Sequence, residues 1–250
     1  VAGGDLTEIV YALHAEDRIV GVDTTSLYPP AARERPSVGY LRQLAAEGIL
    51  ALGPDLVLTT ASAGPPAVLE QIRSAGTPVE MLPEAYTAEG VVAKIVGVEK
   101  ALGVADPGLS QAVRTDFATV ADAVAKAPSK PRVLFVLSIT QGTPLGGGSG
   151  TAADGIIRLA GGTNAVGEVE RYKPLSPEAV AAAAPEVVVI ASHAVEPNGG
   201  LAAIASLPVF AQTPAAKAGR IIAMDSLYIL GFGPRTPQAA RDLAVALHPG

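Results

Sequence analysis

The stretch Pro36-Ser-Val-Gly-Tyr-Leu-Arg-Gln-Leu-Ala-Ala-Glu47, followed by Gly48-Ile-Leu-Ala-Leu-Gly-Pro-Asp-Leu-Val-Leu58, decides the fold and the site. Tyr40 lies in a loop bounded by proline and glycine, and Arg42 follows two positions later. An amphipathic segment carrying Glu47 comes next, and a proline–aspartate pair then leads into an apolar run that predicts a buried strand. We interpret the loop as a ligand site, the segment as a docking point and the strand as their scaffold.

Composition limits the classes of protein to which the chain can belong. Its 250 residues fit one or two domains, and 49% apolar residues are ample for a core, which must be aliphatic because only 4% are aromatic and tryptophan is absent. The net charge of −6, without a long basic cluster, argues against binding to nucleic acid or to anionic membranes. The absence of cysteine removes disulfides, thiolate metal ligands and cysteine nucleophiles.

Strands alternate with helices in the first third of the chain. Helical spacing, short apolar runs and turn residues set the expected limits of each element. We predict helices at 6–13, 43–52 and 67–75, strands at 18–23, 55–60 and 78–82, and a proline-rich loop at 24–36. This alternation predicts βαβ units and a mostly parallel sheet.

The pattern changes at Thr87–Lys126, where apolar residues recur only at helical spacing, with a break near Gly103–Pro107. We interpret this long helical span as a connector between two lobes. Beyond it the expected elements are strands at 132–137, 187–190 and 221–224, helices at 152–160 and from 175 and 236, and a glycine-rich loop at 142–150.

An internal repeat supports two similar lobes. The segment with Glu47 and the strand after it align without gaps, at a constant offset, onto the segment with Glu178 and its following strand. We therefore predict an α/β fold with an N-terminal lobe at 1–85, an inter-lobe helix at 86–128 and a C-terminal lobe at 129–250. Ligands of open α/β sheets bind outside the carboxyl ends of the strands, so we expect a ligand cleft between the lobes.

The chain resembles the haem-binding periplasmic proteins of bacterial haem ABC importers, within the helix-linked class that also binds cobalamin and ferric siderophores. The resemblance covers essentially the whole chain. The stretches that carry it are Val38–Val57, Ala63–Ala67, Tyr172–Glu178 and Gly231–Ala239. It implies that Tyr40 is the axial ligand of the haem iron and that Arg42 donates a hydrogen bond to it.

Tyrosine suits this role chemically. Ferric iron favours an anionic oxygen ligand, and tyrosine supplies one in some haem enzymes. Free tyrosine has a pKa of about 10, so the metal and a neighbouring guanidinium must stabilise the phenolate. Since residues two apart do not face each other on a helix, we expect Tyr40 and Arg42 in an extended segment or turn, with the helix after them.

Further residues are candidates for the haem pocket. Tyr28 competes with Tyr40 as ligand but is expected to pack against its proline-rich loop, and His193, after a predicted strand, is expected at the rim without ligation. Tyr228 is expected near the macrocycle rather than on the iron. Ser62 and Thr143 complete the predicted pocket, and the propionates have candidate partners in Arg73, Arg235 and the amides of Gly146–Thr151.

The resemblance also implies the partners. Glu47 and Glu178 would each dock onto an arginine of the ABC permease dimer, although glutamate in a first helical turn is favoured by the helix dipole alone. We expect a monomer that carries ferric haem for iron acquisition and binds no nucleic acid. We expect a periplasmic or cell-surface exported protein whose signal peptide is not in the chain as given.

Two alternatives stay open. Within the same fold, the ligand could be cobalamin or a ferric siderophore, although the scarcity of aromatic residues favours a flat macrocycle in an aliphatic cleft. From another class, the chain could be an α/β enzyme with a glycine-rich loop. Against this, the sequence lacks a Gly-x-Ser-x-Gly elbow and a His-Glu-x-x-His motif, and its glycines do not match the spacing of phosphate-binding loops.

Overall fold

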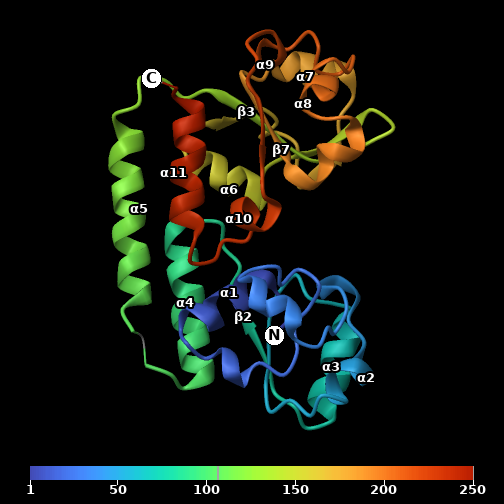
Figure 1. Ribbon diagram of the computed structural model, residues 1–250, viewed down its shortest axis with the longest axis vertical. Coiled ribbons are helices and arrows are strands. Elements are labelled where there is room, and N and C mark those ends of the chain that lie inside the picture. The colour runs from blue at the N-terminus through green and yellow to red at the C-terminus, as the bar shows by residue number, and fades with distance from the viewer. Residues whose placement is uncertain (106, 250) are drawn as a thin grey trace. The chain divides into compact units, whose positions relative to one another are not determined.

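The computed structural model describes residues 1–105 and 107–249, so Asp106, inside the predicted helix break, lies outside the described residues. The chain has the two-lobe α/β architecture expected, and it divides into two compact units, Val1–Thr115 and Asp116–Gly250 (Figure 1). The first predicted connector helix is α4 (Ala88–Leu102), and it contacts α1 and β2 within the first unit. The three-part division at 1–85, 86–128 and 129–250 stays a prediction.

The first unit is built on the parallel pair β1 (Val57–Thr60) and β2 (Val79–Leu82). The Ala2 amide extends the pair by donating to the Leu58 carbonyl at 2.8 Å. The predicted strand at 18–23 is wrong for most of its length. Its first residue, Arg18, ends the 3₁₀ helix η1 (Glu16–Arg18), and strand-like pairing is confined to one bridge between Val22 and Ser37.

Helices surround this pair, and local chemistry sets their ends. They are α1 (Gly4–Ala12), α2 (Ala46–Leu50), α3 (Pro66–Ser74) and α4. Proline occupies the first turn of α3 as predicted, where no amide partner is lost. The Thr87 hydroxyl caps α4, and Gly103 ends it in the left-handed region at φ 62°. The predicted helix at 43–52 is shorter, because Leu44 and Ala45 are extended.

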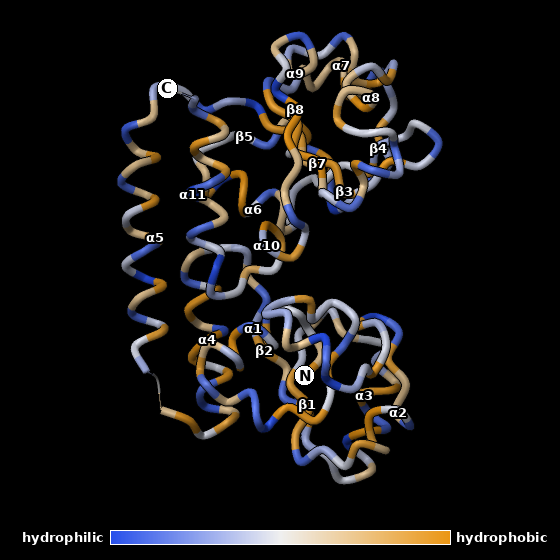
Figure 2. Tube along the Cα trace, viewed as in Figure 1, coloured by the Kyte–Doolittle hydropathy of each residue, from blue (hydrophilic) through white to orange (hydrophobic). Residues whose placement is uncertain are grey.

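The second unit contains a sheet in the order β6-β4-β3-β7-β8, with β5 pairing β3. The strands β3, β5, β7 and β8 run parallel, whereas β4 pairs antiparallel with both of its neighbours, β3 and β6. The prediction of a mostly parallel sheet therefore holds for part of this sheet. Figure 2 shows β3, β7 and β8 as strongly apolar, which matches their place in the core. The bounds are β3 (Arg132–Thr140), β4 (Thr143–Gly147), β5 (Thr163–Asn164), β6 (Tyr172–Pro174), β7 (Val187–Ala191) and β8 (Ile221–Met224).

The prediction of a glycine-rich loop at 142–150 is wrong for most of that stretch, because Thr143–Gly147 form β4, the second strand of a hairpin with β3. The glycines permit close packing. A Cβ at Gly146 would lie 2.4 Å from a Leu175 methyl group, and one at Gly148 would lie 1.8 Å from the Val169 carbonyl oxygen. Any side chain is therefore excluded at Gly148 by backbone, and the Gly148 and Ser149 amides donate to backbone carbonyls rather than facing a ligand.

The second unit contains the helices that a strong apolar periodicity predicted, together with further short ones. Among them α6, α7 and α11 were predicted, as was α5, which begins in the first unit and crosses the boundary after Thr115. The helices α8, α9 and α10 are short and lack a clear pattern. None of the helices among residues 1–105 and 107–249 has the length and apolarity that a membrane span requires. The bounds are α5 (Leu109–Ala125), α6 (Ala152–Leu159), α7 (Pro177–Ala183), α8 (Leu201–Ala205), α9 (Pro214–Lys217), α10 (Ser226–Leu230) and α11 (Thr236–Leu247).

The internal repeat is visible in the structure. Glu47 is the second residue of α2 and Glu178 the second residue of α7, and each helix precedes a fully buried strand. That strand pairs parallel with a later one in both units, β1 with β2 and β7 with β8. Both units therefore offer strand carboxyl ends at which loops carry functional side chains.

Candidate functional site

Tyr40 stands at the start of a 3₁₀ helix, η3 (Leu41–Gln43), with extended dihedrals of φ −83° and ψ 133°. Tyr40 is therefore extended as predicted, Arg42 lies in the short 3₁₀ turn, and the α-helix begins after both. The tyrosine is 43% exposed, and Arg42 is exposed too. Across the described part of the chain, neither side chain makes a hydrogen bond or ion pair. Both polar groups are thus available to a ligand.

Backbone hydrogen bonds hold this tyrosine loop on two sides. Gly39, directly before the tyrosine, has φ +88°, which favours glycine, and its carbonyl accepts from the Thr24 amide at 2.9 Å. On the other side, the Leu44 amide donates to Gly64 at 2.9 Å, and the Gly64 amide donates to Leu41 at 3.0 Å. Because Gly64 follows β1, these bonds fix the loop at the carboxyl end of the strand.

Ser62 follows the same strand end, as predicted, and its hydroxyl donates to both oxygens of Glu84, at 2.8 and 3.0 Å. The Tyr86 hydroxyl donates to the same carboxylate at 3.2 Å. Sequence reasoning missed Glu84 and Tyr86. Their position just after the predicted strand at 78–82 was the available signal, since residues after neighbouring parallel strands share one sheet edge.

Two other predicted residues of the first unit differ in their surroundings. Tyr28 is 40% exposed and belongs to the segment that pairs with the Tyr40 loop. Arg73 forms an ion pair with Glu70 on the last turn of α3. That helix starts after β1 and ends before β2, and a contact of Arg73 with the ligand stays a prediction.

In the second unit, Thr143 and His193 lie just beyond the carboxyl ends of the parallel strands β3 and β7. The Nδ1 atom of His193 is 2.8 Å from the Ser226 hydroxyl, which orients an exposed imidazole. The predicted anion partners at Gly146–Thr151 differ from expectation, because the Gly148 and Ser149 amides donate to backbone carbonyls at 2.9 and 2.7 Å.

Tyr228, on α10, is held within its own unit. Its hydroxyl donates to Asp242 at 2.7 Å, and the Arg235 guanidinium lies 5.2 Å from the ring centre. Burial, together with the hydrogen bond to Asp242, raises the pKa of Tyr228 well above its ordinary value, against the opposing charge of Arg235. The phenol is thus stabilised in its protonated form, and the place of Tyr228 near the macrocycle stays a prediction.

The two predicted docking residues are both exposed in the first turn of their helices. The pKa of the Glu178 carboxyl is lowered by its own backbone amide and by the Ser176 hydroxyl. The preference for glutamate at this position of the first turn is therefore explained by its own helix, without a partner, as the helix-dipole explanation requires. It does not conflict with a contact to a partner.

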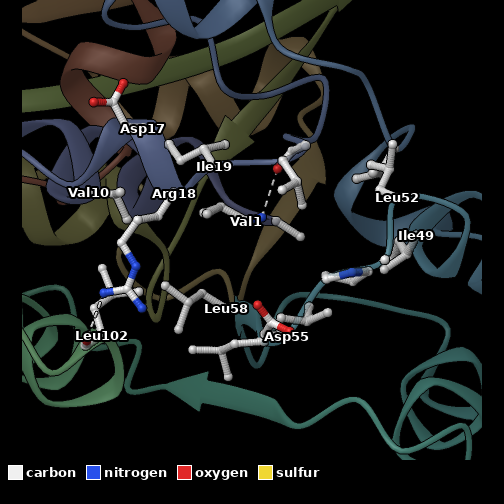
Figure 3. Close-up of a pocket in the computed structure, with 18 residues that line it drawn as sticks. Val1, Val10, Asp17, Arg18, Ile19, Ile49, Leu52, Asp55, Leu58 and Leu102 are labelled. Carbon is white, nitrogen blue, oxygen red and sulfur yellow. Dashed lines mark hydrogen bonds between the residues drawn. The ribbon is translucent and has the colours of Figure 1, made fainter.

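The first unit also contains an apolar cavity of about 320 Å³ (Figure 3). Its walls include Asp55–Leu58 at the beginning of β1, together with Ile19, Leu52 and Leu102. Val38, two residues before Tyr40, also lines it, whereas none of the predicted site residues does. Within residues 1–105 and 107–249, no three His, Cys, Asp or Glu side chains form a group that could hold a metal ion.

The comparisons with known proteins agree on the class of protein and name two kinds of ligand. The periplasmic heme-binding protein BhuT, in complex with two hemes, is 46% identical, with a TM-score of 0.95 over 98% of this chain and 96% of its own. The periplasmic heme-binding protein RhuT from Roseiflexus sp. RS-1, in apo form, is 40% identical, with a TM-score of 0.92 over 98% and 95%. A vitamin B12-binding protein of Vibrio parahaemolyticus is 26% identical over 93% of this chain and 82% of its own.

The family model described as periplasmic binding protein matches residues 1–228, which include the whole first unit and the sheet of the second. This match spans far more than half of the chain, and the solved structures above share its fold from end to end. The chain belongs to the periplasmic binding protein family.

Proposed function

We propose that the protein binds ferric haem through the Tyr40 phenolate and delivers it to an ABC permease. The observation that carries the proposal is the pair of Tyr40 and Arg42, both exposed and both without a partner among the described residues. The haem-binding titles of the similar structures support the choice of ligand. The family is one of substrate-binding transport components, so the protein binds its cargo without transforming it.

The roles of the two side chains follow from their chemistry. The phenolic oxygen of Tyr40 supplies an anionic ligand to iron(III), and the bond to the metal replaces the phenol proton. The Arg42 guanidinium stabilises the negative oxygen by donating a charge-assisted hydrogen bond. Because the loop is held by backbone bonds on both sides, the ligand is presented without large rearrangement. Haem contacts predicted for the second unit stay predictions.

A titration with haemin tests the proposal. Purified protein should form a high-spin ferric complex with a tyrosinate-type absorption spectrum, and the endpoint counts the haems bound. Tyr40→Phe keeps the ring and removes the oxygen, so its affinity should fall by about 30- to 1000-fold, the range of a loss of about 2–4 kcal/mol at a binding hot spot. Tyr28→Phe tests the competing ligand, since that tyrosine is similarly exposed. It should keep the tyrosinate spectrum, and loss of that spectrum in Tyr28→Phe but not in Tyr40→Phe would assign the iron to Tyr28.

Cobalamin is the second candidate, because a vitamin B12-binding protein is among the relatives. Titration with cyanocobalamin under the same conditions separates the two. Tight binding of cyanocobalamin, with haemin bound only weakly and without the tyrosinate spectrum, would overturn the proposal and favour cobalamin.

For delivery, we propose that Glu47 and Glu178 dock onto cationic residues of the permease. Their equivalent positions in the repeat and their exposure support this. Glu47→Lys combined with Glu178→Lys should abolish transport in cells or reconstituted vesicles while haemin affinity stays unchanged. A loss of haemin affinity would instead assign the two residues to folding or to the ligand site.

A further inference from the structure

Asp23 is a buried carboxylate, only 2% exposed, at the start of the segment that leads to Tyr28. Its oxygen Oδ1 accepts from the Gly3 amide at 2.9 Å and from the Ser26 hydroxyl at 3.0 Å. Its oxygen Oδ2 accepts from the Thr25 amide at 3.0 Å and from the Thr25 hydroxyl at 2.7 Å. Four donors thus converge on one side chain, which ties the beginning of the chain to the 23–26 turn.

The neighbouring hydroxyl groups extend this network onto α1. The Ser26 hydroxyl is 2.8 Å from that of Thr7, and the Thr25 hydroxyl accepts from the Gly4 amide at 3.0 Å. The turn is therefore held against the first turn of the helix from both sides. A buried polar network in which each group has partners restrains its members more than separate hydrogen bonds would.

The same turn carries the Tyr40 loop. The Thr24 amide, next to Asp23, donates to Gly39, and Gly39 directly precedes Tyr40. The backbone of Val22 pairs with Pro36 and Val38 at 2.9 Å each, on the other side of Asp23. The segment that holds the tyrosine loop in place is thus the segment whose conformation the carboxylate fixes.

We infer that Asp23 is a positioning residue for the ligand: it fixes the 23–26 turn, and through the Thr24–Gly39 hydrogen bond it sets the orientation of Tyr40. The inference rests on the proposed function and deepens it. Tyr40 itself is exposed and has no bonding partner among the described residues, so its direction depends on the backbone beneath it. Small displacements of a ligating atom weaken a metal bond strongly.

The variant Asp23→Asn tests this with nearly unchanged volume. In the wild-type protein the Thr25 amide and hydroxyl donate to Oδ2, and the Gly3 amide and Ser26 hydroxyl donate to Oδ1. In either orientation of the asparagine, its amide nitrogen would therefore face two donors. At least one buried donor is left without an acceptor, and the turn must shift to relieve it. The control Thr59→Val removes a buried hydrogen bond of the same unit, 3.0 Å from the hydroxyl to the Ala2 carbonyl, without touching the turn.

The full chain of each variant is titrated with haemin, its spectrum is recorded at saturation, and amide hydrogen exchange is measured. In Asp23→Asn we expect affinity to fall by about 10- to 100-fold, as for outer-shell groups of metal sites, with an altered ferric spectrum and faster exchange at 24–40. Thr59→Val should lose stability but keep the wild-type spectrum. Ser26→Ala, which deletes one donor, gives a milder variant with about a threefold loss of affinity, should Asp23→Asn fail to fold.

The outcomes distinguish the inference from the proposed function. Wild-type affinity and spectrum in Asp23→Asn, or in Ser26→Ala if the first variant does not fold, would overturn the positioning role. An equal loss in Thr59→Val would also overturn it, because stability alone would then explain the effect. Unchanged binding in Tyr40→Phe would overturn the proposed function itself, whatever Asp23→Asn does.

Discussion

Substitution of Gly148 by alanine tests the reading of the glycine-rich stretch as a packing device. An added Cβ would meet the Val169 carbonyl oxygen at 1.8 Å and the Arg171 carbonyl oxygen at 3.0 Å. Both obstacles are backbone atoms, so no rotamer change can relieve the clash. The segment must move, and the bonds from the Gly148 amide to Arg171 and from the Ser149 amide to Val169 are then lost or stretched.

The magnitude follows from these contacts. Two backbone hydrogen bonds contribute about 0.5–1.5 kcal/mol each in net terms, and overpacking a closed site costs about 1–3 kcal/mol more. We therefore expect Gly148→Ala to lower the free energy of unfolding by about 2–6 kcal/mol, with a central value of about 4 kcal/mol. Gly150→Ala is the matched control. That glycine has φ +69° with nothing near its missing Cβ, so only the left-handed backbone opposes alanine, at about 1–2 kcal/mol.

Urea unfolding followed by far-ultraviolet circular dichroism gives both values. Gly148→Ala should be less stable than Gly150→Ala by at least about 1 kcal/mol, and folded protein of both variants should bind haemin as wild type does. If Gly148→Ala instead kept its stability and lost a bound anion or haemin, the stretch would be a ligand loop and the packing argument would be refuted.

Two further predictions concern buried and partly buried charges. Lys94 is only 2% exposed and forms an ion pair with Asp5. Lys94→Met should therefore lower the free energy of unfolding by about 3–5 kcal/mol, because it leaves the Asp5 carboxylate without its partner, and adding Asp5→Asn should recover part of that loss. Strictly additive losses of the two variants in urea unfolding would contradict this coupling. The pKa of Tyr228 is raised in the folded protein, so its contribution to stability is fully present below the tyrosine pKa of the unfolded chain and is lost as pH rises through the folded-state pKa. Asp242→Asn should lower the folded-state pKa of Tyr228, because it removes the acceptor carboxylate. An unchanged ultraviolet titration of phenolate absorbance in that variant would disprove this.

Local patterns predicted most of the regular elements. Long apolar stripes set α4 and α5, and continuous apolar runs set β3 and β7, because burial on both faces leaves little ambiguity. The strand prediction at 18–23 was wrong because a short apolar run does not reveal whether a partner strand exists. The loop prediction at 142–150 was wrong because glycine favours both turns and close strand packing, and only the tertiary neighbours decide between them.

The candidate site was predictable in part. The extended backbone at Tyr40 followed from the spacing to Arg42, and the structure confirms it for the tyrosine, with Arg42 in a short 3₁₀ turn. The hydrogen bond between Gly3 and Asp23 joins residues 20 positions apart, so no local pattern could reveal it. Glu84 could have been found from its position just after the predicted strand at 78–82, since Ser62 follows the neighbouring strand. Arg73 lies in the last turn of α3, where it forms an ion pair with Glu70 that spacing alone did not show, and its contact with a propionate stays a prediction.

The central claim is that the Tyr40 oxygen binds the iron of haem. Resonance Raman spectroscopy of the ferric complex reports iron–phenolate vibrations directly. We expect these bands in wild type and in Tyr28→Phe, and their loss in Tyr40→Phe. Iron–phenolate bands that persist in Tyr40→Phe, or that are absent from a tight wild-type complex, would contradict it.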